Sequence, residues 1–380
     1  MKRTILYAQY ANSAAYPPVL HSAALFADAG WTVTVLHIAD SATAALTIPQ
    51  QANISVRQLP YVARGWRRAF YFLQFTLWVL WWTLRVRPHW LYASDLFATP
   101  AALVASFFPS VRVVYHEHDT PDATRRLAQW CLRARAALAK RAALCVFPNA
   151  ARAQTFAQQF DAAAKTYTVW NCPARAEVSP PPARDDIQVR LLYHGSVVPS
   201  RLPLTVLDAL AQLPENVCLR IVGYETVGHA GYVETVLERA RALALSARVE
   251  WLGQVPTRAD LLRLARACDV GLALMPMARA AENERTMTGA SNKSFDYLAC
   301  GLDFIVSDLA DWRTLFVENG FARACNPQDA ATIAAAVRWF LEHADERGAR
   351  AARAQAKILN EWNYETQFAP VFARMTTDAG

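Results

Sequence analysis

The chain has 380 residues, of which 54% are hydrophobic and 19% are charged, and its formal net charge is +7. This composition excludes an intrinsically disordered protein, and the length suits two domains with separate cores. The seven cysteines are scattered, with no Cys-x-x-Cys pair and no cluster with histidine. Their spacing argues against a zinc site or a disulfide framework and is typical of a protein in a reducing cytoplasm.

Positive charge is concentrated in the first half of the chain. Residues 1–170 hold 17 Lys and Arg against 7 Asp and Glu, a net charge of +10, whereas residues 171–380 carry −3. We therefore expect one domain to face an anionic partner, for which anionic lipid, a phosphate-bearing acceptor and nucleic acid are the candidates. No recognition-helix, RNA-binding-sheet or zinc-finger pattern accompanies the charge, so we expect no nucleic-acid partner.

Short apolar runs alternate with helical stretches through the first half. Residues 4–9 are too short for a signal peptide and predict a first strand, and residues 16–29 predict a helix that Gly30 closes. Further strands are expected at residues 31–38, 54–59, 90–93, 111–115 and 144–147. Such alternation predicts βαβ units around a parallel sheet.

The segment 64–90 is unusual because its 16-residue apolar core, residues 69–84, is flanked by arginines on both sides. A membrane span takes about 20 apolar residues, so this core is short for one. Two interpretations stay open: a helix buried on all sides, or a helix at a membrane–water interface, where aromatic and arginine side chains are favoured. Six basic residues between 125 and 141 favour the membrane slightly, through attraction to anionic lipid.

A Pro-rich, charged stretch at residues 172–186 predicts a semi-rigid linker between two domains. The alternation then restarts, with helices expected at residues 233–244 and 257–267 and a helical tail over 330–374 that breaks near Asn363. Strands are expected at residues 190–194, 218–222, 248–252, 270–274 and 304–307. We therefore predict an α/β protein with two doubly wound domains, whose ligands bind beyond the carboxyl ends of the strands in the cleft between the domains.

Residues 289–308 combine a small-residue loop, a short helix that Gly301 ends, and a buried strand. Backbone amides of such a loop can approach an anion, which the helix N-terminus also favours. Lys293 and Asp296 lie three positions apart on one helical face, so a nucleotide phosphate over the loop and a ribose on Asp296 would satisfy both. The simpler alternative is a surface loop with a solvent-exposed ion pair.

Five segments of the second half carry a family resemblance through their residues and through the order in which they occur. They are LLYHGSVVPSR (191–201), LRIVGYE (219–225), VEWLGQVP (249–256), ACDVGLALMP (267–276) and NKSFDYLACGLDFIVSD (292–308). Weaker similarities lie at YASD (92–95), VVYHEHD (113–119) and VFPN (146–149). Together they resemble family 4 glycosyltransferases of the GT-B fold. The resemblance implies an acceptor-side Rossmann-like domain at 1–172, a nucleotide-sugar domain at 187–360, and a C-terminal helix at 361–380 that packs back on the first domain.

The resemblance also implies a donor site in the second domain. Its donor-binding residues would be Gly195, Arg201, Val255, Ser291, Asn292, Lys293 and Asp296. Gly195 would lie under the donor diphosphate, with Arg201 and Lys293 as cations that contact it. Fixed cations stabilise the charge that grows on the diphosphate as the anomeric bond breaks. Asp296 would hold the ribose, and backbone groups at Val255 would meet the base.

In the first domain the resemblance points to His118 as the catalytic residue that contacts the donor sugar near the reacting centre. His116 alternates with it on the same strand face, and motif position favours His118. Asp119 would orient the histidine or the acceptor, and Asp95 would contact the acceptor. Each of these two carboxylates could instead be a simple helix N-cap.

The activity that the resemblance implies is retaining transfer of a sugar from a nucleoside-diphosphate sugar to a cell-surface glycan or lipid-linked acceptor. No metal or other cofactor is expected, and the protein would be cytoplasmic and peripheral at the inner face of the membrane. The sequence departs from the family pattern at Thr288, where a glutamate is frequent, at Asp303, where a proline is frequent, and at residues 12–18, where a glycine-rich turn is missing. These departures leave two alternatives open: a non-catalytic binding or assembly subunit, and a sugar-nucleotide epimerase.

Overall fold

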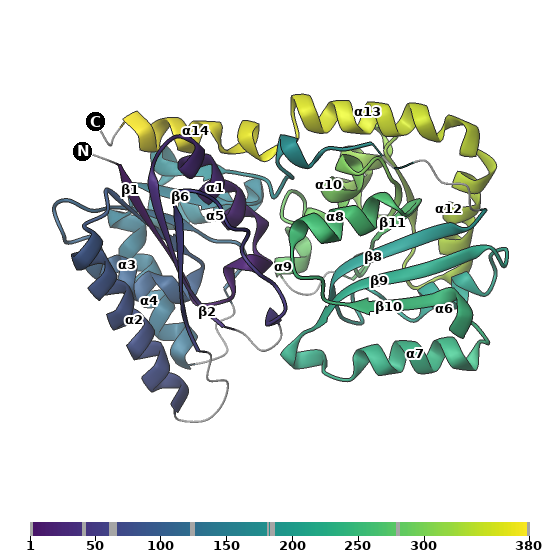
Figure 1. The fold of residues 1–380 in the computed structure, drawn as a ribbon, viewed down its shortest axis with the longest axis horizontal. Helices are drawn as coiled ribbons and strands as arrows, with labels where there is room; N and C mark the ends of the chain where they lie inside the picture. Colours follow the sequence, from purple (N-terminus) through teal and green to yellow (C-terminus); the bar gives the residue numbers. More distant parts are fainter. Residues whose placement is uncertain are drawn as a thin grey trace. The chain divides into compact units, whose positions relative to one another are not determined.

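The computed structural model describes residues 3–39, 43–60, 67–121, 126–180, 182, 187–278 and 282–377. The chain divides into two compact units, one of Met1–Asn171 with Tyr364–Gly380 and one of Cys172–Asn363. The C-terminal segment therefore returns to the first unit (Figure 1). Each unit has its own parallel sheet with helices on both faces, which confirms the predicted fold class.

The first unit is built on a parallel sheet in the order β3-β2-β1-β4-β5-β6-β7. The strands are β1 (Thr4–Gln9), β2 (Thr32–Ile38), β3 (Ile54–Leu59), β4 (Trp90–Ser94), β5 (Arg112–His116), β6 (Leu144–Phe147) and β7 (Thr166–Thr168). Strand order reverses beside β1 and β4, which is where ligands bind in such sheets. The prediction missed β7, because three half-buried residues at a sheet edge carry no apolar run.

Helices cover both faces of this sheet. They are α1 (Pro17–Asp28), α2 (Arg67–Val86), α3 (Thr99–Ala105), α4 (Arg126–Arg141), α5 (Ala150–Phe160) and α14 (Tyr364–Thr377), with 3-10 turns η1 (Ser13–Ala15), η3 (Leu96–Ala98) and η4 (Ala163–Lys165). The helices α1 and α14 share one buried cluster with the sheet, and α2 to α5 share the other (Figure 1). The Trp90 indole donates a hydrogen bond to the Met375 carbonyl at 3.1 Å, which ties α14 to β4.

The apolar segment before β4 forms α2, and residues 64–66 of it lie outside the described part. One face of α2 is buried through Phe72, Phe75 and Val79, whereas Phe70 and Trp81 on another face are 62% and 51% exposed. The interpretation of a helix buried on all sides is therefore wrong. No helix in the described ranges combines the length and the apolar character that a membrane crossing requires.

The second unit is a parallel sheet in the order β10-β9-β8-β11-β12-β13. The strands are β8 (Val189–Val197), β9 (Val217–Glu225), β10 (Val249–Gly253), β11 (Val270–Ala273), β12 (Asp303–Ser307) and β13 (Ala322–Cys325). The order reverses beside β8 and β11, so the carboxyl end of β8 lies at the switch point. The edge strand β13 was not predicted, because its two middle residues are not fully buried and one is an arginine.

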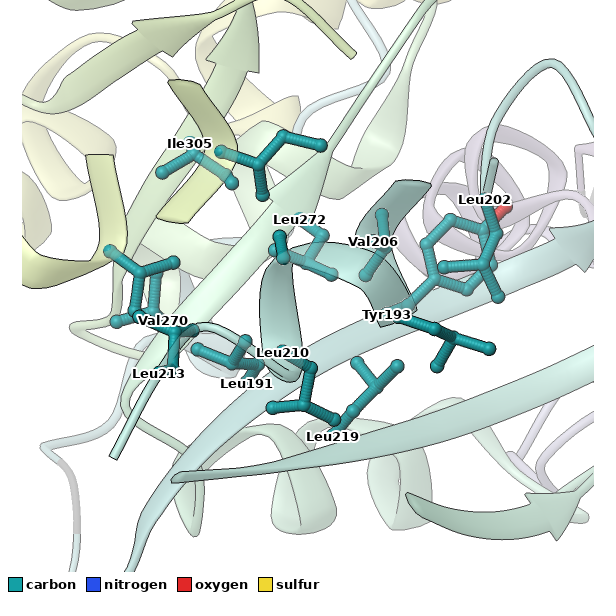
Figure 2. Close-up of a cluster of buried hydrophobic side chains, with 14 of the residues drawn as sticks. Leu191, Tyr193, Leu202, Val206, Leu210, Leu213, Leu219, Val270, Leu272 and Ile305 are labelled. Carbon is teal, nitrogen blue, oxygen red and sulfur yellow. The ribbon is translucent and has the colours of Figure 1, made fainter. Parts of the chain in front are cut away.

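The helices of this unit are α6 (Thr205–Leu210), α7 (Tyr232–Ala242), α8 (Arg258–Arg266), α9 (Glu282–Arg285), α10 (Asn292–Ala299), α11 (Ala310–Trp312), α12 (Ala330–Glu342) and α13 (Arg347–Asn360), with short turns η5 (Arg175–Glu177), η6 (Val227–His229), η7 (Ser246–Arg248), η8 (Arg313–Val317) and η9 (Ala344–Glu346). A cluster that includes Leu191, Leu210 and Leu272 packs α6, α7 and α12 against one face (Figure 2). The predicted break near Asn363 is confirmed, since α13 ends at Asn360 and α14 begins at Tyr364.

The predicted linker at residues 172–186 is only partly described, and residues 181 and 183–186 lie outside the description. Its first part is packed into the second unit: Cys172 is 1% exposed, and Glu177 binds the guanidinium of Arg258. The Ser179 amide donates to the carbonyl of Ala299 at 3.3 Å. The described part is therefore not a solvated spacer, because its acidic side chain and its backbone both have partners on the second unit.

Candidate functional site

The carboxyl end of β8 brings two glycines together. Gly195 adopts φ +105°, in the region that favours glycine, and it lies opposite Gly223 of β9 in the parallel register. A Cβ on Gly223 would stand 1.8 Å from the carbonyl oxygen of Gly195, so no larger residue fits there. The sequence prediction had singled out Gly195 but not its partner. This pair allows the backbones of β8 and β9 to approach each other closely at the ends of the two strands.

Lys293 of α10 reaches this turn. Its Nζ atom lies 3.3 Å from the position that a Cβ on Gly195 would take, and 5.4 Å from the centroid of the Tyr193 ring. Burial, and next the positive charge of Arg201, lowers the pKa of Lys293 to about 7, although the negative charge of Asp296 opposes the shift. The predicted association of Gly195 with Lys293 is thus present in the structure.

Arg201 provides a second cation at the same turn. It follows β8 in a turn whose backbone amide donates to the Val198 carbonyl, and its Nη2 atom lies 4.0 Å from the sulfur of Met287. Among the described residues, neither Arg201 nor Lys293 forms an ion pair with a carboxylate. Two such cations beside a glycine turn are the arrangement that an anionic ligand requires.

Asp296 is not on the surface of α10. It is 1% exposed, and its two oxygens accept hydrogen bonds from Arg258 at 2.6 and 3.2 Å. Arg258 also binds Glu177, with contacts of 2.6 and 2.9 Å. Burial alone would lower the pKa of Arg258, but Asp296 and Glu177 together raise it. The alternative of a solvent-exposed pair between Lys293 and Asp296 is therefore wrong, and a ribose on Asp296 would share oxygens that Arg258 already occupies.

Two further residues hold α10 against the sheet. The Tyr297 hydroxyl donates toward the carbonyls of Leu192 and Leu272, at 3.2 and 3.1 Å, and its ring leaves no room for a Cβ on Gly271. The His194 Nε2 atom lies 3.6 Å from Asp296, and burial lowers the pKa of His194 well below its usual value. The position of Lys293 therefore depends on polar contacts beneath the helix.

The loop before α10 keeps polar atoms available at the helix start. Ser291 stands at the N-cap position without a side-chain capping bond, and the amides of Ala290 and Ser291 both donate to the Met287 carbonyl. The Oδ1 atom of Asn292 is buried without a hydrogen-bond partner among the described residues. Val255 is half-buried and follows β10. The side chains of Ser291 and Asn292 therefore keep polar atoms available at the start of α10, next to Lys293.

Thr288, the residue that replaces the frequent glutamate, has an acidic partner. Its hydroxyl donates to the carboxylate of Asp311 in α11. A carboxylate is therefore present next to position 288, although it comes from a different element. Sequence reasoning missed Asp311 because 23 residues separate it from Thr288 and it lies outside every family-like segment.

In the first unit, the candidate residues lie after β4 and β5. Asp95 adopts φ +66° and accepts hydrogen bonds from the backbone amides of His118 at 2.8 Å and Asp119 at 3.4 Å. It makes no capping bond to η3, so the N-cap alternative is wrong for Asp95. Burial, then the nearby Asp119, raise the pKa of Asp95 to about 8. Asp119 itself is exposed, and the residues just after Pro121 lie outside the description.

His118 is buried and held on several sides. Its Nε2 atom lies 2.9 Å from the Ser94 hydroxyl, and its carbonyl accepts a hydrogen bond from Arg152 at 2.9 Å. The rings of His116 and His118 are 4.0 Å apart, which confirms that they share a face, and His116 contacts the Tyr92 hydroxyl at 2.6 Å. Burial lowers the pKa of His118 to about 4. At neutral pH this imidazole is uncharged and acts through hydrogen bonds.

Gln9 is a candidate that the sequence prediction missed. It ends β1 opposite Ser94, at the switch point of the sheet, and is 1% exposed. Neither its amide nitrogen nor its amide oxygen has a hydrogen-bond partner among the described residues. An unpaired buried amide is costly, which makes Gln9 a candidate ligand contact near His118. A polar residue at the end of a central strand was the signal that could have found it.

No group of three or more potential metal ligands occurs in the ranges that the structure describes. Positive charge at the carboxyl end of β8 comes from two side chains, Lys293 and Arg201.

The second half of the chain and the overall fold are similar to known proteins. Residues 204–373 match the model of a family described as glycosyl transferase-like. HepE from Anabaena, solved with UDP and glucose, is 20% identical with a TM-score of 0.73, over 99% of this chain and all of that chain. Sucrose-phosphate synthase from Thermosynechococcus elongatus is 13% identical with a TM-score of 0.73, and both chains are fully covered.

A third structure, described as a UDP-N-acetylglucosamine 2-epimerase from Listeria monocytogenes, is 13% identical with a TM-score of 0.63, over 99% of this chain and 96% of that chain. The fold alone therefore does not separate transferases from epimerases. No curated protein sequence matches the chain. The match over residues 204–373 and the shared fold agree with the resemblance drawn from the motifs: this part of the chain is similar to glycosyl transferase-like proteins, and the whole chain has the GT-B fold.

Proposed function

We propose that this protein transfers a sugar from a UDP-sugar, with retention of anomeric configuration, to a cell-surface glycan or a lipid-linked acceptor. The observation that carries the proposal is the pair of cations, Lys293 and Arg201, at the glycine turn of Gly195. Neither cation has a carboxylate partner among the described residues, and a diphosphate would supply the negative charge that both can bind. UDP and glucose bound to HepE, a protein of the same fold, supply the donor chemistry that we extend to this chain.

The proposed donor site works by stabilising the leaving group. As the anomeric bond lengthens, negative charge grows on the diphosphate, and the fixed charges of Lys293 and Arg201 lower the barrier at that point. Backbone amides of the loop at Ser291 and Asn292 add further donors. Because two side chains supply the positive charge, we propose that the reaction requires no metal ion.

Asp311 gives the proposed site an acidic group at the position where the frequent glutamate is missing. Its carboxylate, held by the Thr288 hydroxyl, would accept a hydrogen bond from a hydroxyl of the donor sugar. This arrangement favours an active enzyme over a non-catalytic subunit, because a pure binding protein has no need of a carboxylate there. In the first unit, we assign His118 as the group that contacts the sugar, and Asp95 and Asp119 to the acceptor side.

A screen of nucleotide sugars tests the proposal. The purified protein is incubated with UDP-, GDP- and ADP-sugars and a set of glycan and polyprenyl-phosphate-linked acceptors, and nucleotide release is measured. Acceptor-dependent release of UDP, with a product of unchanged anomeric configuration by NMR, supports the proposal. Interconversion of the donor sugar without an acceptor supports an epimerase instead. Nucleotide binding without turnover of any donor supports the non-catalytic subunit.

A further inference from the structure

The described part of the first unit exposes its large apolar side chains in one layer of helices. Exposed side chains in this set have 45% to 68% of their surface accessible. They are Phe70, Leu73, Leu77, Trp81 and Leu84 of α2, Val104 of α3, Phe107 just after α3, and Trp130 of α4. We name this set the α2–α4 surface. Monomeric soluble proteins rarely gather so many large apolar side chains on one exposed face, which marks it as a binding surface.

On α2 the exposed residues follow helical spacing. The steps from Phe70 through Leu73, Leu77 and Trp81 to Leu84 are three, four, four and three residues, so the side chains form one stripe. A second stripe, which includes Phe75 and Val79, is fully buried on the sheet. The buried stripe anchors the helix while the other stays open. Figure 1 shows α2, α3 and α4 together on one side of the first sheet.

The charge of this surface is entirely positive. The sequences of α2, α3 and α4 contain no Asp or Glu, and the exposed residues Arg67, Arg85, Lys140 and Arg141 lie on α2 and α4. The Arg85 guanidinium lies 5.5 Å from the centre of the Trp81 ring, and that of Arg141 lies 3.8 Å from the centre of the Phe107 ring. Basic groups therefore border the apolar side chains closely.

We propose that the α2–α4 surface docks the protein on an anionic lipid bilayer. The aromatic and leucine side chains enter the boundary between headgroups and acyl chains, and the arginines and lysine bind phosphate and carboxylate groups of the lipids. A second copy of this chain fits less well, because a two-fold contact would set one basic surface against another. The proposal does not depend on sugar transfer, but it would bring the acceptor-side unit to a lipid-linked acceptor.

Vesicle co-sedimentation tests the proposal without any nucleotide. The full chain is mixed with phosphatidylcholine vesicles that contain either no anionic lipid or about 30 mol% phosphatidylserine, an anionic lipid that gives a membrane surface a negative potential. We expect binding to the anionic vesicles only, and loss of most binding when salt is raised to about 0.5 M, since added salt screens the lipid charge. Failure to bind at low salt, or equal binding to both vesicles, would overturn the proposal.

Two sets of variants separate the surface from the rest of the chain. Leu77→Glu with Trp81→Glu should reduce binding by about tenfold or more, because charge replaces apolar contact at the interface. Leu359→Glu, at a 42% exposed leucine of α13 in the second unit, should leave binding unchanged. Thermal unfolding of the double variant checks that the chain still folds. A wild-type dimer in light scattering that the double variant loses, with vesicle binding unaltered, would assign the surface to a second copy and refute lipid docking.

Discussion

The ammonium group of Lys293 lies against the backbone of Gly195, so close that a Cβ on the glycine would stand 3.3 Å from Nζ. The two residues are 98 positions apart in the sequence and come from α10 and β8. The contact joins a backbone turn to a charge at the carboxyl end of a central strand. Most of the functional expectations depend on this one contact.

Substituting Gly195 by alanine tests the contact from the backbone side. At φ +105° a side chain strains the turn, at a cost of about 1–3 kcal/mol, and its Cβ presses on Lys293. We expect a lower unfolding midpoint and a Kd for UDP that rises about tenfold, which is about 1.4 kcal/mol. Calorimetric titration measures the second effect. Gly348→Ala is the control, since a Cβ there meets nothing within 4 Å and that variant should bind UDP normally.

The lowered pKa of Lys293 predicts that the protein takes up a proton when it binds the donor. At pH 8.5 the free protein holds most of Lys293 neutral, because its pKa is about 7. A bound diphosphate stabilises the ammonium form and raises this pKa, so binding takes up a proton, and affinity falls as the pH rises above about 7. Titration of a UDP-sugar in two buffers with different ionisation enthalpies measures the uptake. Lys293→Arg stays charged throughout and should bind with no uptake from this position; an unchanged uptake in that variant contradicts the assignment.

Arg258 is expected to contribute to stability as well as to the site. It is 9% exposed and joins the buried carboxylate of Asp296 to the partly buried carboxylate of Glu177, so Arg258→Met removes the cation that these two acids share beneath α10. Breaking a buried pair in this way costs about 3–5 kcal/mol. Urea unfolding measures the loss as a shift in the transition of the second unit. Arg263→Met removes an arginine that is 67% exposed, and a shift of similar size there would show that burial does not matter.

The carboxylate of Asp311 is expected to act on the sugar and not on the nucleotide. Asp311→Asn keeps the shape of the side chain but removes its charge next to Thr288. We expect turnover of the donor to fall by about 10²-fold, the loss that follows removal of one group that stabilises the transition state. Affinity for UDP should stay within about twofold of the wild type, because UDP lacks the sugar. A variant that loses UDP affinity and keeps its turnover would place Asp311 elsewhere.

The sequence predicts the central strands and the first residues of the donor site, for clear physical reasons. Strands such as β1 and β6 are buried apolar runs, and Gly195 and Lys293 stand at motif positions beside strand and helix ends. Edge strands such as β7 and β13 lack that signal, because only part of their surface is buried. The local sequence pattern therefore predicts the buried central strands well and the partly exposed edge strands poorly.

The partners of the predicted residues could not be found from the sequence. Asp296 was expected to share a surface with Lys293, because helical spacing places them on one face. In the structure the Asp296 carboxylate accepts a hydrogen bond from Arg258, which lies 38 residues earlier in the chain. The same guanidinium also donates to the carboxylate of Glu177. Such pairing depends on how α8 and η5 pack against α10, which no local pattern contains. The same holds for Thr288 and Asp311.

Nucleotide binding by the two cations is the most direct test of this account. Thermal unfolding is followed with and without UDP for the wild type, for Arg201→Ala and for Lys293→Ala. UDP is expected to raise the unfolding midpoint of the wild type by several degrees, which is about the effect of a ligand at 100 times its Kd, and each alanine variant is expected to lose most of this shift. A shift of the same size in both variants, or no shift with any nucleotide in the wild type, would contradict it.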